Sequence, residues 1–203
     1  MIVYVESNFV LELAFLQEEH ESCEKLLSLS ESKDIHLVLP AFSIGEPYET
    51  WVRRSKQRRE LHEQLRRTIG DLSRSRPYQE SSQEFQELTN LLLNSVEDEK
   101  NRLDEILERI LQPIEVIPID LNTIREAIKF QESRDLEPQD SIVYASIIEH
   151  LTTASKGLRC FITRDKDFVE NPDIKSDLAT YDCRLFTKFA DGLGYIGSEL
   201  KKN

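Results

Sequence analysis

The chain begins with MIVYVESNFV, residues 1–10. Residues 2–5 form a short apolar run of β-branched and aromatic side chains, which predicts a buried strand. The polar residues Glu6, Ser7 and Asn8 follow directly, and this pattern predicts that a helix starts here with Ser7 or Asn8 as its N-terminal cap. A strand at the very start of the chain is expected to lie near the centre of its sheet.

Beyond this start, short apolar runs alternate with segments of helical spacing. Strands that alternate with helices imply crossover connections, and therefore a parallel sheet of the α/β class. In such sheets, ligands lie beyond the carboxyl ends of the strands. The further predicted strands are 35–39, 114–119, 159–163 and 184–187, and the predicted helices are 9–30, interrupted by an acidic stretch at 17–21, then 121–132 and 138–155.

The segment 50–112 has a different character. Helical spacing begins near residue 41, continues into a basic stretch and is interrupted near 70–77. A second long amphipathic helix is predicted over 81–111, where apolar residues recur every three or four positions. These features predict a helical hairpin, residues 50–112, inserted into a single α/β domain that spans 1–203.

The composition sets the broad class of the protein. With 203 residues, 39% hydrophobic content and few Gly and Pro, the chain is long enough to bury a core and is not disordered in composition. Its three cysteines, an odd number without a CxxC pair, predict reduced thiols rather than a disulfide framework. No basic leader precedes the first strand, and no stretch approaches the roughly 18 apolar residues of a membrane span. We expect a cytoplasmic protein that does not enter a membrane.

Charge is distributed unevenly along the chain. The formal net charge is −12, which is unusual for a protein that handles nucleic acid. Residues 51–76 nevertheless hold nine Arg and Lys against three acids, a local charge of +6 that leaves −18 on the remainder. Two interpretations are open: this segment guides RNA phosphates, with Arg53, Arg54, Arg58 and Arg59 as RNA-binding candidates, or it is a solvated helix face. Aromatic side chains close by that could stack on a base are Tyr48, Trp51 and His62.

Four acids fall where a parallel sheet gathers its ligands. Glu6 ends the first strand, and Asp165 stands two residues past the strand that ends at Thr163. Asp140 continues the apolar stripe of its own helix, and Glu46 lies near the start of the helix after the second strand. Clustered carboxylates repel one another and are stable mainly when a divalent cation neutralises them, so they indicate a cation that can polarise a phosphodiester. The segments that contain them are VYVESNFV (3–10), LPAFSIGE (39–46), DSIVYA (140–145) and FITRDKDF (161–168).

Each acid also has a purely structural interpretation. Glu6 could interact with a helix dipole, and Asp165 could be a turn residue. Asp140 could be an N-terminal helix cap, which is compatible with a role in a site. Glu46 is of a type common on helix surfaces, and Glu49 competes with it as the meaningful acid.

In order, spacing and strand or helix context, the four segments resemble the PIN-domain nucleases. The resemblance covers residues 1–50 and 114–190 and leaves the hairpin 50–112 outside. It implies a Rossmann-like α/β/α sandwich in which the matching acids gather around Mg²⁺ or Mn²⁺ and cut single-stranded RNA. The matching acids are Glu6, Glu46, Asp140 and Asp165, with Asn8 and Thr163 as orienting groups around them and Asp167 as the substitute for Asp165.

One residue departs from the family pattern. The family usually has Asp where this chain has Glu6, and the additional methylene displaces the carboxylate. Since Mg²⁺ tolerates displaced ligands poorly, the metal shifts, Mn²⁺ is preferred, or the centre is impaired.

The main hypothesis is a metal-dependent endoribonuclease, such as the toxin of a toxin–antitoxin pair with an antitoxin protein as partner. The alternative is a catalytically weak PIN-like module that binds RNA or a protein through its hairpin. PIN-like proteins often form dimers, and an apolar face on 88–110 would suit a homodimer or would pack within the hairpin. Phosphoryl transfer through an aspartyl-phosphate has the least support, and the sequence contains no zinc, nucleotide-binding or serine-nucleophile motif.

Overall fold

The structure, a computed structural model, describes residues 1–202, and at residues 80–84, 86 and 87 the backbone alone. Its centre is a five-stranded sheet in the order β3-β2-β1-β4-β5, and all neighbouring strands are parallel. The first strand of the chain lies in the middle of the sheet, so the predicted α/β class with a parallel sheet is confirmed. The strands are β1 (Ile2–Tyr4), β2 (His36–Pro40), β3 (Glu115–Ile117), β4 (Arg159–Ile162) and β5 (Cys183–Phe186).

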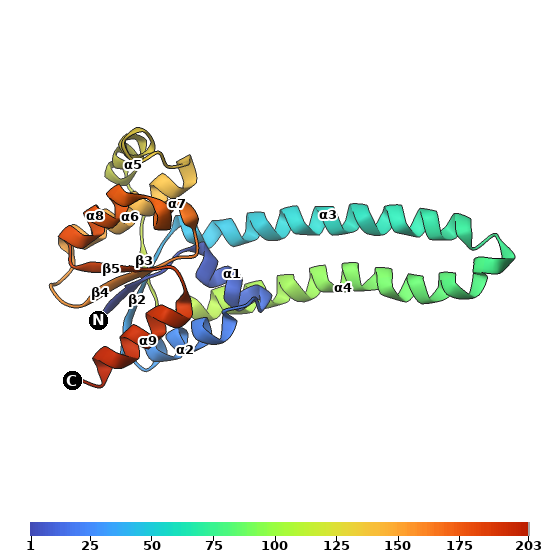
Figure 1. The fold of residues 1–203 in the computed structure, drawn as a ribbon, viewed down its shortest axis with the longest axis horizontal. Coiled ribbons are helices and arrows are strands. Elements are labelled where there is room, and N and C mark those ends of the chain that lie inside the picture. Colours follow the sequence, from blue (N-terminus) through green and yellow to red (C-terminus); the bar gives the residue numbers. More distant parts are fainter. Residues whose placement is uncertain (203) are drawn as a thin grey trace.

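Helices cover both faces of this sheet, as Figure 1 shows. The predicted segment 9–30 is two helices that pack on one face together with the last helix of the chain. The other face is covered by the helices that surround β4, and α5 packs on α6. The first layer contains α1 (Ser7–Phe15), α2 (His20–Glu31) and α9 (Phe189–Leu200), and the second contains α5 (Leu121–Arg134), α6 (Pro138–Thr153), α7 (Lys166–Glu170) and α8 (Pro172–Thr180).

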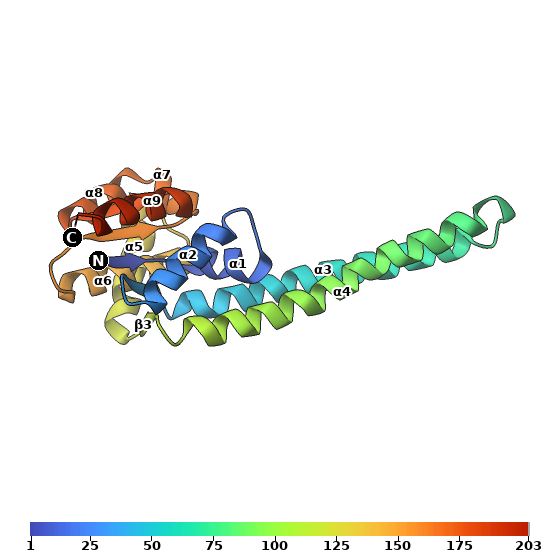
Figure 2. The same ribbon diagram turned by 90° about the horizontal axis from the view of Figure 1, so that it is seen from below.

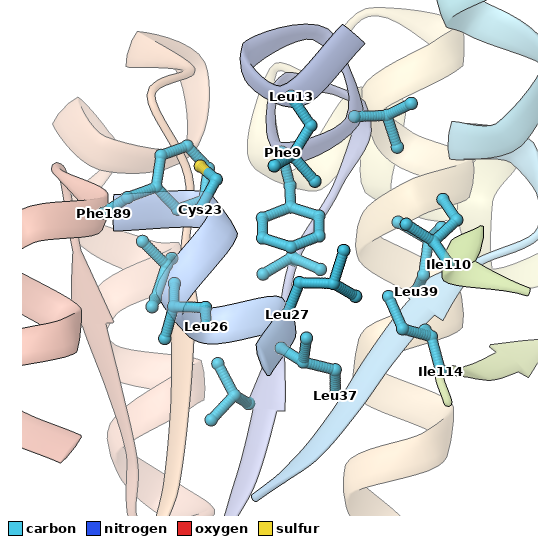
Figure 3. Packing of buried hydrophobic residues seen from close by; sticks show 14 of the residues in the cluster. Phe9, Leu13, Cys23, Leu26, Leu27, Leu37, Leu39, Ile110, Ile114 and Phe189 are labelled. Carbon is cyan, nitrogen blue, oxygen red and sulfur yellow. The ribbon is translucent and has the colours of Figure 1, made fainter. Parts of the chain in front are cut away.

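Successive side chains of each strand point to opposite faces and therefore to two separate cores. In β1, Val3 belongs to the core under α1 and α2, whereas Tyr4 belongs to the core under α6. Figure 3 shows the first core, in which Phe9, Leu27 and Leu39 meet side chains from the end of α4. This two-sided burial explains why the strands appear in the sequence as continuous apolar runs.

A helical arm leaves the sheet between β2 and β3. It consists of α3 (Phe42–Leu72), the short 3-10 helix η1 (Arg76–Tyr78) and α4 (Gln79–Ile110), and we call the rest of the molecule the body. The two long helices run side by side away from the body (Figures 1 and 2). The hairpin is present as predicted, but residue 50 is not a boundary, because α3 is continuous from its start beside the sheet.

The arm is held by a narrow seam with a polar pair inside it. On α4, buried side chains recur at three- and four-residue spacing, as in a two-stranded coiled coil. Glu99 is one of them, and its carboxylate binds the Arg58 guanidinium of α3 at 2.8 and 2.9 Å. The buried α4 residues are Thr89, Val96, Glu99, Leu103, Leu107 and Ile110.

The structure adds details that the sequence patterns did not predict. The helices α7, α8 and α9 were not predicted, and the observed strand ends differ from the predicted ones by one or two residues. All three cysteines are free and buried. Although α3 and α4 are long, no helix in the described part of the chain combines such length with the apolar character needed to cross a membrane.

Candidate active site at the carboxyl edge of the sheet

The four predicted acids come from four separate elements that converge beyond the carboxyl ends of the central strands. Glu6 follows β1 and is the N-cap of α1, which corrects the prediction that Ser7 or Asn8 caps this helix. Asp165 follows β4 and is the N-cap of α7. Glu46 lies in the second turn of α3, which follows β2. Asp140 lies in the first turn of α6.

Glu6 is the most buried of the four, with 4% of its surface exposed. Its Oε2 accepts hydrogen bonds from Ser7 Oγ at 2.9 Å and from the Asn8 backbone N–H at 2.8 Å. Its Oε1 accepts a hydrogen bond from Thr163 Oγ1 at 2.9 Å. Burial raises the pKa of the Glu6 carboxyl, and the hydrogen bonds oppose that shift. The Glu6 side chain, one methylene longer than that of Asp, therefore extends from the end of β1 to Thr163, the residue that follows β4.

Thr163 and Asp165 form the next links in the same chain of contacts. The hydroxyl of Thr163 is fully buried, and it also accepts the backbone N–H of Asp165 at 2.9 Å. The Asp165 carboxylate in turn accepts the backbone N–H of Asp167 at 2.9 Å. Burial raises the pKa of Asp165, and this backbone hydrogen bond opposes the shift. These contacts join Thr163 to both Glu6 and Asp165, and the orienting role predicted for it stays a prediction.

Asp140 is the acid of this group whose pKa is affected by the largest number of neighbouring carboxylates. The cap of α6 is Glu137, so the prediction that Asp140 caps this helix is wrong. Burial raises the pKa of Asp140 to about 7, and repulsion by the nearby carboxylates adds to this effect. In order of size, those carboxylates belong to Asp165, Glu46, Asp167 and Glu6. The structure therefore places the predicted acids in one neighbourhood.

Glu46 completes the group from the side of α3. Its pKa is raised first by burial and then by the charges of Asp165 and Glu49, and a hydrogen bond from the Ser7 side chain opposes the shift. Ser7 therefore lies between Glu46 and Glu6, whose carboxylate its hydroxyl also contacts. This bridging residue was predicted only as a helix cap, although its place directly after Glu6 in the sequence is a usable signal.

The donor set fits a hard divalent cation in its chemistry, because all four side chains offer carboxylate oxygens and repel one another. The side chains are not arranged around a single point: among the residues described, no three His, Cys, Asp or Glu side chains are placed to hold one metal ion. The four carboxylates are therefore close enough to affect one another's pKa, but a cation would have to draw them closer together before it could bind to several of them.

Comparison with known families agrees with this geometry. The sequence model of a family described as PIN domain matches residues 3–168. This chain belongs to the PIN-domain family. Members of the family are generally nucleases that use divalent metal ions. The matched range of this PIN domain encloses the arm, which the resemblance of the four short segments left outside. No curated protein and no solved structure gives a match.

Two further residues were predicted to support the centre of this PIN domain. The backbone and side chain of Asn8 both donate hydrogen bonds to Glu6, which agrees with an orienting position. Asp167 is exposed, and its charge contributes to the raised pKa of Asp140. Neither contact shows a catalytic role, so both roles remain predictions.

In the basic segment 51–76, two of the four arginines predicted to bind RNA contact other side chains, and the other two are exposed. Arg58 is held by Glu99, and Arg54 stacks over the Phe15 ring with its guanidinium carbon 4.9 Å from the ring centre. Arg53 and Arg59 are exposed and form no ion pair with the side chains that the structure describes. Two of the four RNA-binding candidates are therefore free to meet a phosphate.

The aromatic residues beside this segment are also occupied. Trp51 donates its indole N–H to the backbone carbonyl of Val96 at 3.0 Å, and Tyr48 donates its hydroxyl to Asp104 at 2.7 Å. Lys100 lies over both rings. Their contacts hold the base of the arm together, which weakens the interpretation that they stack on an RNA base.

An ion pair between Glu12 and Arg164, which was not predicted from the sequence, lies beside the acidic centre. Glu12 is buried within α1 and contacts Arg164, the residue between Thr163 and Asp165. A glutamate among the apolar residues of α1 is a visible signal, but its partner lies 152 positions away.

Proposed function

We propose that this protein is a metal-dependent endoribonuclease that hydrolyses single-stranded RNA. The observation that carries the proposal is the position of Asp140, whose carboxyl is repelled by acids from three other elements of the sheet edge. Such a cluster is costly to fold unless it serves to bind a cation. Membership of the PIN-domain family supports the same reaction class.

The residues proposed to hold Mg²⁺ or Mn²⁺ are Asp140, Asp165, Glu46 and Glu6, which offer only oxygen ligands. When bound, such a cation polarises a phosphodiester and lowers the pKa of a water molecule. Ser7 and Thr163 fix the direction of the Glu6 carboxylate by hydrogen bonds from both sides. In the metal-free protein Asp140, with its pKa raised to about 7, can hold a proton at its carboxylate oxygen, and a bound cation would displace that proton.

The free cations of α3 support RNA as the substrate. Arg53 lies seven residues after Glu46, which is two helical turns on the same face and about 10 Å along the helix axis. Its guanidinium is exposed, so it is available to a backbone phosphate. We propose that single-stranded RNA approaches the acidic centre along this face of α3.

The test of this proposal is cleavage of a labelled single-stranded RNA by the intact chain and by Asp140→Asn. We expect metal-stimulated cleavage by the parent protein and a loss of at least about 100-fold in Asp140→Asn, because a ligand should matter at least as much as the groups that orient ligands. Glu105→Gln, an exposed acid on the arm, is the matched control. Equal rates for the parent and Asp140→Asn would refute the proposal.

A second candidate function is a catalytically weak module that binds RNA or a protein. It is favoured by the lack of three acids around one point in the described residues and by the full engagement of Glu6 in hydrogen bonds. Under this alternative, neither Mn²⁺ nor Mg²⁺ changes the melting temperature. An antitoxin partner, a homodimer and a cytoplasmic location remain predictions.

A further inference from the structure

An ion pair with a buried carboxylate and a partly exposed guanidinium lies next to the acidic centre but contributes no group to it. Glu12, in the middle of α1, has 1% of its surface exposed. One of its oxygens accepts the backbone N–H of Glu19 at 2.7 Å, and the other contacts a terminal nitrogen of Arg164. The second terminal nitrogen of Arg164 reaches the exposed Glu18 at 3.1 Å.

The sequence position of Arg164 connects this ion pair to the acidic centre. Its neighbours are Thr163, which contacts Glu6, and Asp165, which begins α7. The segment after β4 is therefore attached at two points to α1, by Thr163 to the N-cap Glu6 and by Arg164 to Glu12. These points lie six residues apart, or about 9 Å along the axis. The Thr163 N–H also donates to the Phe186 carbonyl of β5 at 3.1 Å, so the Arg164 contact adds a further constraint on the side of α1.

Stability alone does not explain a pair of this kind. Burial removes hydration from the Glu12 carboxylate, whereas Arg164, with 34% of its side chain exposed, keeps part of its own hydration. Replacement of a buried charge and its partner by uncharged side chains of similar size is often neutral or stabilising. Here the pair opposes a defined force, because Asp165 and Asp140 repel each other across the sheet edge. Without a second attachment, that repulsion would push the segment that carries Asp165 outwards.

We propose that Arg164 is a positioning residue: with Glu12 it forms a latch that holds Thr163 and Asp165 against α1, so that the acidic centre stays assembled before a cation arrives. The role in cation binding rests on the proposed function, but the latch itself is a property of the metal-free protein. The two parts can therefore be tested separately.

The first experiment compares Arg164→Met with the double variant Glu12→Gln plus Arg164→Met. In the single variant, Glu12 remains buried without its partner, so we expect the melting temperature to fall by about 10 °C. The double variant removes both charges and retains an acceptor for the Glu19 amide, so most of that loss should be recovered. The double variant therefore lacks the latch but remains stably folded, so its other properties report on the latch and not on misfolding.

The decisive measurement is amide hydrogen exchange in the metal-free double variant. The reporters are the amides of residues 163–167, and especially that of Asp165, which donates to Thr163. We expect their exchange to accelerate at least about tenfold while amides within β4 exchange as in the parent. Arg109→Met, which removes a guanidinium that joins α4 to Glu24 and Glu31 of α2, is the control and should leave these amides unchanged. Unchanged exchange in the double variant would overturn the proposal, whatever the protein cleaves.

The second measurement concerns the centre itself. Titration with Mn²⁺, followed by electron paramagnetic resonance, should show about tenfold weaker binding in the double variant, because groups that orient ligands typically contribute that much. A double variant with a loosened segment but parental Mn²⁺ affinity would refute the positioning role. If the parent protein binds no Mn²⁺ and cuts no RNA, the proposed function fails, and the exchange measurement still decides whether the latch exists.

Discussion

Buried charged side chains are stabilised in different ways in the body and in the arm. In the body, the contacts of the acidic centre join residues far apart in the chain, such as Glu6 and Thr163, and two apolar cores fix the strands that carry them. In the arm, the pair Arg58–Glu99 joins α3 to α4 within the seam between these two helices. The comparison suggests that the body can maintain repelling carboxylates because its framework is stabilised elsewhere, whereas the arm must neutralise each buried charge locally.

The largest effect should come from breaking the arm pair. In Arg58→Met, Glu99 remains mostly buried without a partner, and we expect the arm to lose about 3 kcal/mol of local stability. Limited proteolysis should show faster cleavage within α3 and α4 while the body keeps its melting transition. Arg67→Met removes a cation from an exposed pair with Glu63, and this control should leave stability nearly unchanged. Equal sensitivity of body and arm in Arg58→Met would mean that they unfold as one unit.

The acidic centre should make the body respond to pH. Because burial raises the pKa of Asp140 to about 7, above an unfolded value of about 3.9, its contribution to stability is present at low pH and lost as pH rises through 7. The pKa values of Glu6, Glu46 and Asp165 are shifted in the same direction.

Between pH 5.5 and 8, we therefore expect the metal-free protein to lose at most about 2 kcal/mol, which is the full value for the shift of Asp140 over this range before any reduction for its partial exposure. Thermal unfolding in the presence of a chelator measures this loss. Asp140→Asn should flatten the pH dependence, and Glu105→Gln on the arm should leave it unchanged. A parent protein that becomes more stable towards pH 8 would contradict the repulsion inferred for the centre.

The importance of the Glu6 side-chain length can be tested by shortening the side chain. Glu6→Asp should retain a helix cap but lose the contact with Thr163, the residue that follows β4, at a cost of about 1–2 kcal/mol. Glu6→Gln retains the length of the side chain and should keep that contact. Chemical denaturation of both variants makes the comparison. If Glu6→Asp is as stable as the parent, the link between β1 and β4 is not important for the body.

The smallest effect concerns the side of the arm along which we propose that RNA approaches. Arg53→Ala should raise the KM for single-stranded RNA about threefold to fivefold, leave kcat unchanged and reduce the salt dependence of binding by about one charge. Arg67→Ala, farther along α3, should have little effect. A fall in kcat instead would place Arg53 in the chemistry rather than in binding.

The sequence predicted the sheet well because its strands are buried on both faces, and continuous apolar runs such as 35–39 and 159–163 are hard to mistake. The short helices near the end were missed for local reasons. In α9, glycines weaken the helical pattern, yet Gly192 is needed there, because a Cβ at this position would lie 2.4 Å from Ile162 Cδ1.

The acids of the centre were predicted from their places beside strand and helix ends, and the structure brings them into one neighbourhood. Their roles as metal ligands stay predictions, because no cation contact is described. The latch could not be predicted, since nothing in the sequence pairs Glu12 with Arg164. The free or occupied state of the arginines on α3 also depends on the register between two helices, which periodicity alone does not determine.

The length of the arm has a consequence for how the protein behaves in solution. A compact chain of 203 residues would have a radius of gyration of about 17 Å, whereas an arm of two helices of about 30 residues extends some 45 Å. Such a particle diffuses slowly for its 23.7 kDa and will elute early from a sizing column. A monomer can therefore resemble a dimer by elution volume, and the predicted homodimer should be judged by light scattering, which measures mass independently of shape.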